Sequence, residues 1–178
     1  MFSFERGLTD AIFRFSSQAV FLKPLFAFCG EVLPYILFLF FVIRLFMVKS
    51  LKLRYYYFFL ASLAVIISRG IVTEVIRFLF EVSRPFVELG FDPLINHAAT
   101  PSFPSGHMAF LIPLTIVVAK MNRRAGWQFG ALTLLVGISR VFSGVHWISD
   151  ILGGIAVGVF AFWAAKNLLP KKLSEEDI

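Results

Sequence analysis

Charged residues and cysteine are both scarce in this sequence. Only 16% of its 178 residues are charged and 58% are hydrophobic, whereas soluble domains average about 25% charged residues. This composition excludes an ordinary soluble domain and indicates that lipid surrounds much of the chain. Cys29 is the one cysteine, so no intrachain disulfide can form and cysteine usage does not indicate a compartment.

Two kinds of binding motif are also missing. The formal net charge is +6, but the basic residues lie at the ends of apolar runs and are not interleaved with aromatic residues, so we expect no nucleic-acid partner. No cluster of Asp, Glu, His and Cys has the spacing of a metal cage. We therefore expect neither a metal nor another cofactor.

The N-terminal 22 residues do not have the uninterrupted apolar core of a signal peptide. Apolar residues recur at helical spacing from Leu8 to Leu22, with Glu5 just before them and Asp10 among them. This pattern predicts an amphipathic helix that lies in the membrane interface and packs on the rest of the protein. A tilted first crossing is the alternative.

Five apolar segments follow, and a membrane-crossing helix needs about 20 residues. They cover approximately residues 25–48, 55–80, 105–120, 127–142 and 147–169, and residues 83–104 form a loop with Pro, Gly, Asp and Asn. We predict an all-α fold, a polytopic transmembrane helical bundle of five to six spans with the N-terminal amphipathic helix at the interface. Because the spans use most of the chain, residues 1–178 are predicted to form a single membrane-embedded domain.

Basic residues concentrate in three regions, at 44–54, 120–124 and 166–172. By the positive-inside rule these regions are cytoplasmic, so the 83–104 loop and the 143–146 turn are predicted to face outward together.

Ionisable residues are costly within a membrane and therefore indicate functional sites. Here they gather at the predicted outer ends of the spans. Arg77 and Arg84 are seven residues apart, or two helical turns, so we expect them on one helix face that ends before Pro85. His146 and Asp150 are four residues apart, which lets their side chains meet on one face of the last helix.

These side chains suit phosphoryl transfer. An imidazole held by a carboxylate, as in the pair His146 and Asp150, is an activated nucleophile. His107 can protonate the departing oxygen. Guanidinium groups and the backbone N–H groups at the start of a helix can hold the phosphate oxygens. The predicted substrate-binding residues are Arg77, Arg84, Arg140, Ser105 and Gly106.

The same residues resemble the signature of a known family, the type 2 phosphatidic acid phosphatase superfamily. Three segments are similar to its motifs in order and spacing: Arg77-x6-Arg84-Pro85, Pro104-Ser105-Gly106-His107 and Ser139-Arg140-x5-His146-x3-Asp150. One position departs from the pattern, because the family usually has Lys where this chain has Arg77. The positive charge is kept, but a guanidinium offers a bidentate fork where an ammonium is a point charge.

The resemblance implies a metal-independent lipid phosphatase built as a helical bundle. It implies that His146 attacks phosphorus to form a phosphohistidine, and that His107 first protonates the leaving group and then activates water. It also implies an integral-membrane enzyme that hydrolyses a lipid phosphate or diphosphate at the outer membrane face. The expected partners are this lipid substrate and the surrounding membrane lipids.

The segment from His97 to His107 is similar to bacterial undecaprenyl-diphosphatases of the superfamily. Undecaprenyl diphosphate is therefore the first substrate candidate, and the bacterial inner (plasma) membrane the expected location, with the active site facing the periplasm or cell exterior. A phosphatidylglycerophosphate phosphatase or a lipid A 1-phosphatase is the alternative. Vanadate-dependent haloperoxidases share the motif but are larger and soluble, and a non-catalytic lipid-binding or transport protein is the remaining class.

Further predictions concern two acidic residues, one histidine and one pair of glycines. Glu74 and Glu81 lie three and four residues from Arg77, where they either aim its side chain or form plain helix-surface ion pairs. His97 is predicted to contact lipid headgroups or solvent. Gly154-x3-Gly158 predicts close helix packing.

Overall fold

The computed structural model describes residues 3–19 and 21–169, and every regular element within these ranges is helical. The elements in chain order are α1 (Ser3–Gln18), α2 (Lys23–Ala27), η1 (Phe28–Val32), α3 (Leu33–Phe46), α4 (Leu51–Val65), η2 (Ile66–Val72), α5 (Thr73–Leu79), α6 (Pro85–Leu89), α7 (Gly106–Met121), α8 (Arg123–Phe142) and α9 (Ile148–Leu168). The all-α prediction is confirmed. The basic tail predicted around Lys171 and Lys172 lies outside the described residues.

Within the described residues, four helical segments are long and apolar enough to cross a membrane. They are Lys23–Phe46, Leu51–Leu79, Arg123–Phe142 and Ile148–Leu168. The first two are each interrupted by one stretch of π-helix, η1 and η2. Helix α7 has only 16 residues and is therefore about 24 Å long, so the structure has four candidate spans where the sequence indicated five to six.

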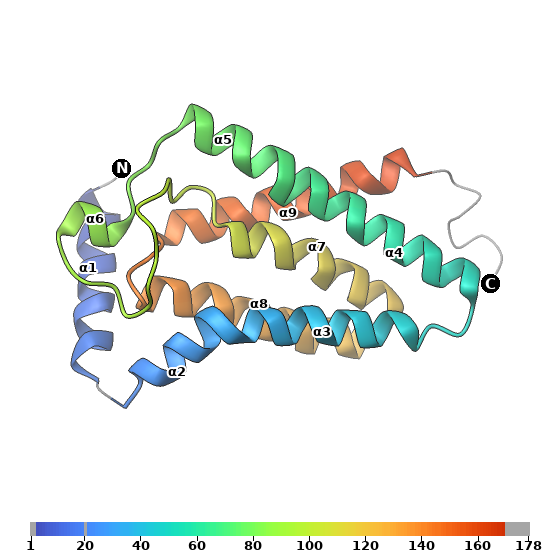
Figure 1. Ribbon diagram of the computed structural model, residues 1–178, viewed down its shortest axis with the longest axis horizontal. Helices are drawn as coiled ribbons and strands as arrows, with labels where there is room; N and C mark the ends of the chain where they lie inside the picture. The colour runs from blue at the N-terminus through green and yellow to red at the C-terminus, as the bar shows by residue number, and fades with distance from the viewer. Residues whose placement is uncertain (1–2, 20, 170–178) are drawn as a thin grey trace.

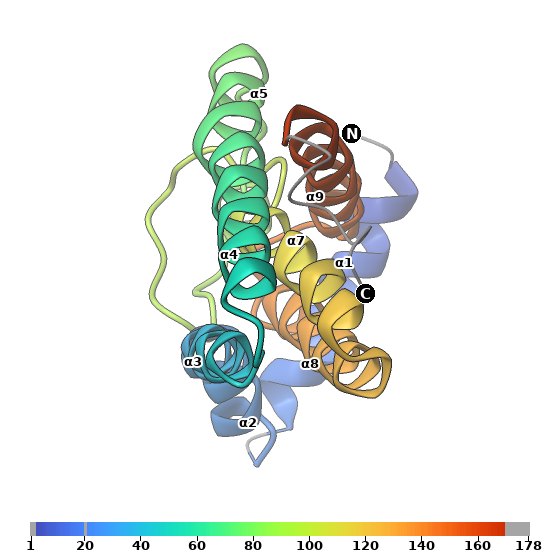
Figure 2. The same ribbon diagram turned by 90° about the vertical axis from the view of Figure 1, so that its right-hand side faces the viewer.

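The short helix α7 lies in the middle of the bundle. It contacts α3, α4, α8 and α9, which run along the long axis of the molecule around it (Figures 1 and 2). Its buried residues, such as Met108 and Val117, are distributed over several faces of the helix. A helix that is apolar all round in this way belongs in a core.

Helix α1 runs across one end of the bundle instead of along it (Figure 1). The Glu5 carboxylate accepts a hydrogen bond from the Ser149 backbone N–H at 2.7 Å, and the rings of Phe13 and Phe91 stack with their centroids 3.7 Å apart. Phe15 on its other side is exposed. The predicted amphipathic helix is thus present, and it is not among the candidate spans.

The predicted glycine stripe is confirmed as a place of close helix packing. A Cβ on Gly154 of α9 would lie 2.6 Å from the carbonyl oxygen of Ser105, and one on Gly158 would lie 2.7 Å from Cβ of Ile112 in α7. The same approach lets the Ser105 backbone N–H donate to the carbonyl oxygen of Asp150 at 2.9 Å. Two segments of the predicted site are joined in this way.

The two segments predicted to face outward lie at the same end of the bundle. The backbone N–H of Phe86 donates to the carbonyl oxygen of Gly144 at 3.2 Å, and that of Leu94 donates to Ser143 at 3.1 Å. The turns that join α3 to α4 and α7 to α8, which contain the basic residues, lie at the opposite end (Figure 1).

Candidate active site

His146 and Asp150 form the predicted contact, but they do not share one helix face, because His146 precedes Trp147, the N-cap of α9. Oδ2 of Asp150 lies 3.0 Å from Nδ1 of His146 and accepts a hydrogen bond from the Trp147 backbone N–H at 2.8 Å. Both side chains are buried. Asp150 therefore caps the start of α9 and holds the imidazole with the same carboxylate oxygen.

The neighbours of His146 determine which ring nitrogen has the free lone pair. Nη1 of Arg84 lies 3.4 Å from Nε2 of His146, and a guanidinium can only donate, so Nε2 is the acceptor and Nδ1 carries the proton. Burial, with the positive charges of Arg140 and Arg84, lowers the pKa of His146 well below its usual value. The imidazole is thus neutral at physiological pH, with its lone pair on Nε2.

Arg84 connects the loops of the site through its guanidinium group. It donates to the carbonyl oxygens of Thr100, Val145 and Pro101 at 2.9, 2.8 and 3.3 Å. Burial is the main cause that lowers its pKa to about 10, so it still carries a positive charge at neutral pH. Arg84 therefore provides charge beside Nε2 of His146 and holds two loops together.

The prediction that Arg77 and Arg84 share one helix face is wrong. Helix α5 ends at Leu79, and Arg84 lies in extended backbone with φ −74° and ψ 154°. The backbone N–H of Ser102 donates to the carbonyl oxygen of Val82 at 2.8 Å, so this segment pairs with the following loop. Pro85 acts as the first residue of α6, the helix position where proline is favoured.

Arg77 and Arg140 each have nitrogen atoms that no other group satisfies. Arg77 donates from Nη2 to the carbonyl oxygen of Pro104 at 3.0 Å, and Arg140 from Nη1 to that of Gly30 at 3.3 Å. Within the described part of the chain, Nε of both arginines, Nη2 of Arg140 and Oγ of Ser105 are buried without a hydrogen-bond partner. Buried charged donors without partners are costly, and an oxyanion would satisfy them.

The start of α7 presents backbone donors beside these arginines. Ser105 is its N-cap but makes no side-chain capping bond, so the first N–H groups of the helix are available to an anion. Gly106 and His107 follow at this end and line the same cavity as His146.

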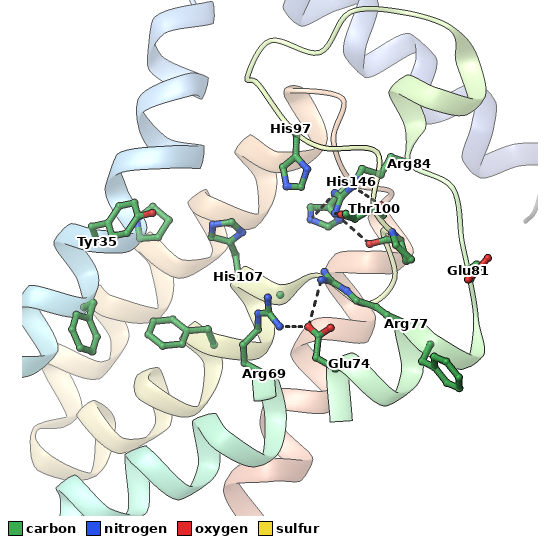
Figure 3. A pocket seen from close by; sticks show the side chains of 16 residues that line it. Tyr35, Arg69, Glu74, Arg77, Glu81, Arg84, His97, Thr100, His107 and His146 are labelled. Atoms are coloured by element: carbon green, nitrogen blue, oxygen red, sulfur yellow. Dashed lines mark hydrogen bonds and ion pairs between the residues drawn. The ribbon is translucent and has the colours of Figure 1, made fainter. Parts of the chain in front are cut away.

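The cavity has a volume of about 980 Å³ and joins polar and apolar walls (Figure 3). Its polar wall contains His107 and His146. Helices α3, α5 and α7 contribute apolar and aromatic side chains to the cavity, among them Pro34, Tyr35, Phe38, Phe78 and Phe110. Arg77 and Arg84 also line it, whereas Arg140 and Asp150 are buried and are not among the lining residues. A lipid headgroup with the first part of its tail matches this combination.

His97 and Arg69 line the cavity, although the sequence did not predict them as site residues. His97 is half-buried, its ring centroid lies 6.3 Å from that of His146, and burial is the main cause that lowers its pKa to about 4. It forms part of the cavity wall, not a contact to headgroups or solvent alone. Arg69 forms an ion pair with Glu74, which also lies 3.8 Å from Arg77. Of the two acidic residues predicted to lie beside Arg77, Glu74 is the one that contacts it.

The sequence contained a signal for Arg69 but none for His97. Arg69 is a charge in the middle of an apolar segment, which by itself indicates function. His97 lies in an irregular loop, where spacing does not indicate which side chains turn inward.

Comparison with known proteins agrees with this geometry. The chain matches the family model described as PAP2 superfamily over residues 58–174. The chain belongs to the PAP2 superfamily. Phosphatidylglycerophosphatase B of Bacillus subtilis (strain 168) is among its curated relatives, at 33% identity over 105 residues.

Two curated relatives and one solved structure illustrate the similarity. Undecaprenyl-diphosphatase BcrC of Bacillus subtilis (strain 168) is 34% identical over 102 residues, which are 56% of this chain and 53% of that protein. Bacitracin transport permease protein BcrC of Bacillus licheniformis is 30% identical over 152 residues, 83% of this chain and 73% of the relative. The crystal structure of Aquifex aeolicus LpxE has a TM-score of 0.70 at 20% identity, covers 93% of this chain and 96% of its own, and shows the shared fold. The match spans about half the length of the first relative.

Proposed function

We propose that this PAP2 phosphatase removes the terminal phosphate of a lipid diphosphate. Undecaprenyl diphosphate is the leading candidate for this substrate. The observation that carries the proposal is the neutral His146, held by Asp150 on Nδ1 and facing Arg84 with Nε2. It lies in the wall of a cavity that is polar at one side and apolar at the other. The similarity to an undecaprenyl-diphosphatase supports the substrate.

The first step transfers the phosphoryl group to the enzyme. Nε2 of His146 attacks the terminal phosphorus, the bond from phosphorus to the bridging oxygen breaks, and the lipid monophosphate leaves with a proton from His107. The Asp150 carboxylate stabilises the phosphorylated imidazolium. Arg77 and Arg140 use their unsatisfied N–H groups to hold the equatorial oxygens, where negative charge gathers in the transition state.

The second step releases inorganic phosphate. His107, now neutral, takes a proton from water while the water oxygen bonds to phosphorus. The N–P bond breaks, and the pair of electrons returns to Nε2 of His146. Together the two steps consume one diphosphate and one water and yield one lipid monophosphate and one phosphate.

Each predicted site residue keeps its role in this proposal. The catalytic residues are His146, His107 and Asp150, and the substrate-binding residues are Arg77, Arg84, Arg140, Ser105 and Gly106.

The proposed topology places the cavity at the outer membrane face. The basic turns at the opposite end of the bundle support a cytoplasmic position for that end. Helix α7 is then a fifth, short crossing that the other helices enclose, α1 lies in the outer interface, and residues 1–178 act as one domain. In a bacterium the cavity would open to the periplasm or cell exterior from the inner membrane.

The test measures phosphate release in detergent with EDTA from undecaprenyl diphosphate, phosphatidylglycerophosphate and lipid A. We expect rapid release from the diphosphate by the wild type and by the control Arg124→Gln, whose exposed side chain lies at the far end of the bundle, and no release by His146→Ala. Equal release by His146→Ala overturns the histidine mechanism. Release from a different lipid only would replace the substrate with that lipid.

A second measurement tests the covalent intermediate. With substrate labelled on its terminal phosphate, an alkaline quench preserves an N–P bond. We expect label on the wild-type protein during turnover and none on His146→Ala. Unlabelled wild type would contradict the phosphohistidine.

A further inference from the structure

Arg69 is a fourth guanidinium group in the wall of the cavity, and no step of the proposed reaction uses it. It lies on the π-helical stretch η2, in the middle of the second candidate span. Its ion pair with Glu74 leaves 41% of the side chain exposed. A charge at this depth of a membrane helix is expensive and calls for a function.

The backbone of α7 fixes where this guanidinium lies. A Cβ on Gly106 would lie 2.9 Å from Nε of Arg69, so the guanidinium packs directly on the residue before His107. In Figure 3, His107 lies between Tyr35, on the apolar side of the cavity, and His146, and Arg69 lies below His107, beside Glu74. Arg69 is therefore on the side from which the lipid tail reaches the nucleophile.

In-line phosphoryl transfer assigns this side to the leaving group. The nucleophile and the leaving oxygen lie on opposite sides of the phosphorus, and the tail is part of the leaving group. The leaving group of a lipid monophosphate is an alcohol, which needs only the proton from His107. The leaving group of a lipid diphosphate is a phosphate monoester, whose negative charge also needs a cation.

Glu74 holds two guanidinium groups in succession. It forms the ion pair with Arg69 and lies 3.8 Å from Nη1 of Arg77. In the proposed reaction Arg77 is beside the terminal phosphoryl group. Arg69, on the other side of Glu74, would then lie beside the next phosphate of the substrate, the one linked to the lipid. Two phosphates in sequence match two guanidinium groups in sequence.

We propose that Arg69 binds the second, lipid-linked phosphate of a diphosphate substrate and makes the enzyme prefer diphosphates to monophosphates. This proposal rests on the proposed function and adds a specificity-determining residue to it. The alternative role of Arg69 is a contact to lipid headgroups, as is common for arginines in membrane helices. Such a contact would not distinguish the two classes of substrate.

The test compares a polyprenyl diphosphate with the monophosphate of the same prenyl chain, so that the apolar part is constant. For Arg69→Gln we expect kcat/KM to fall roughly 10- to 100-fold for the diphosphate, the range for one charged hydrogen bond, and to change less than about threefold for the monophosphate. Arg69→Lys should keep most of the preference, because the ammonium supplies the charge. Arg124→Gln should leave kcat/KM unchanged for both substrates.

The two substrates also control for folding. Monophosphate hydrolysis by the same preparation of Arg69→Gln reports an intact site, and Arg69→Lys tests the charge with a smaller change of shape. Equal loss on both substrates, or an unchanged preference for the diphosphate in Arg69→Gln, overturns the proposal. A wild type that releases no phosphate from either substrate contradicts the proposed function instead, so the two failures are distinguishable.

Discussion

Nη1 of Arg84 lies 3.4 Å from Nε2 of His146, the nitrogen whose lone pair would attack phosphorus. This contact sets the tautomer of the imidazole, and the same positive charge helps to keep it neutral. It also occupies the lone pair while no substrate is bound. A phosphoryl oxygen that accepts the Arg84 N–H would release Nε2, so substrate binding itself would free the nucleophile.

Replacing Asp150 with Asn is expected to reduce kcat about 10²- to 10⁴-fold. An amide can turn its NH₂ group toward His146 and favour the tautomer with the proton on Nε2, and it cannot stabilise the imidazolium. The measurement is kcat for phosphate release by Asp150→Asn. The matched control is Ser102→Ala, which removes a hydroxyl 3.4 Å from Oδ1 of Asp150 and should cost far less. Similar rates for Asp150→Asn and wild type would contradict the role of the carboxylate.

The acid limb of the pH–rate profile should show how the positive charge of Arg84 affects the pKa of His146. A protonated His146 has no lone pair on Nε2, so activity that depends on it is lost as the pH falls below its pKa. That pKa lies well below its usual value in the wild type. Arg84→Gln removes a positive charge and therefore raises the pKa of His146. The acid limb of kcat/KM then moves to higher pH. The shift is partial because burial is the largest cause.

Arg84→Lys is the control for this profile. It keeps the positive charge, so its acid limb should remain near that of the wild type even where kcat falls. An acid limb at the same pH in Arg84→Gln and wild type would show that the charge does not control His146.

Gly154→Ala should destabilise the protein without removing any catalytic group. Its Cβ would meet the carbonyl oxygen of Ser105 at 2.6 Å and Cβ of Met108 at 2.7 Å, so α7 and α9 must move apart. Overpacking of this kind typically costs about 1–3 kcal/mol in the free energy of unfolding. Thermal unfolding in detergent would measure it. Gly7→Ala is the matched control, since no atom lies within 4 Å of its added Cβ, and an equal loss in both variants would contradict the packing argument.

The helical class of the protein and the local geometry of its proposed nucleophile, His146, follow from the sequence alone. Apolar segments bounded by charges define helices because each helix satisfies its own backbone hydrogen bonds. The contact of His146 with Asp150 joins two residues only four positions apart, one just before the N-cap of α9 and one in its first turn. The motifs around Arg77, His107 and Arg140 indicated the family, because the residues of each motif and their spacing can be read directly from the sequence.

Tertiary structure alone decided which distant residues share the cavity. The helix that carries Arg77 ends at Leu79, and Arg84 reaches His146 from a loop held by the carbonyl oxygens of Thr100 and Val145. His97 enters the wall by the path of an irregular loop. Arg69 reaches α7 because Gly106 leaves room for its guanidinium. Such contacts join residues that are far apart in the chain, and they depend on how whole helices pack, which no local pattern specifies.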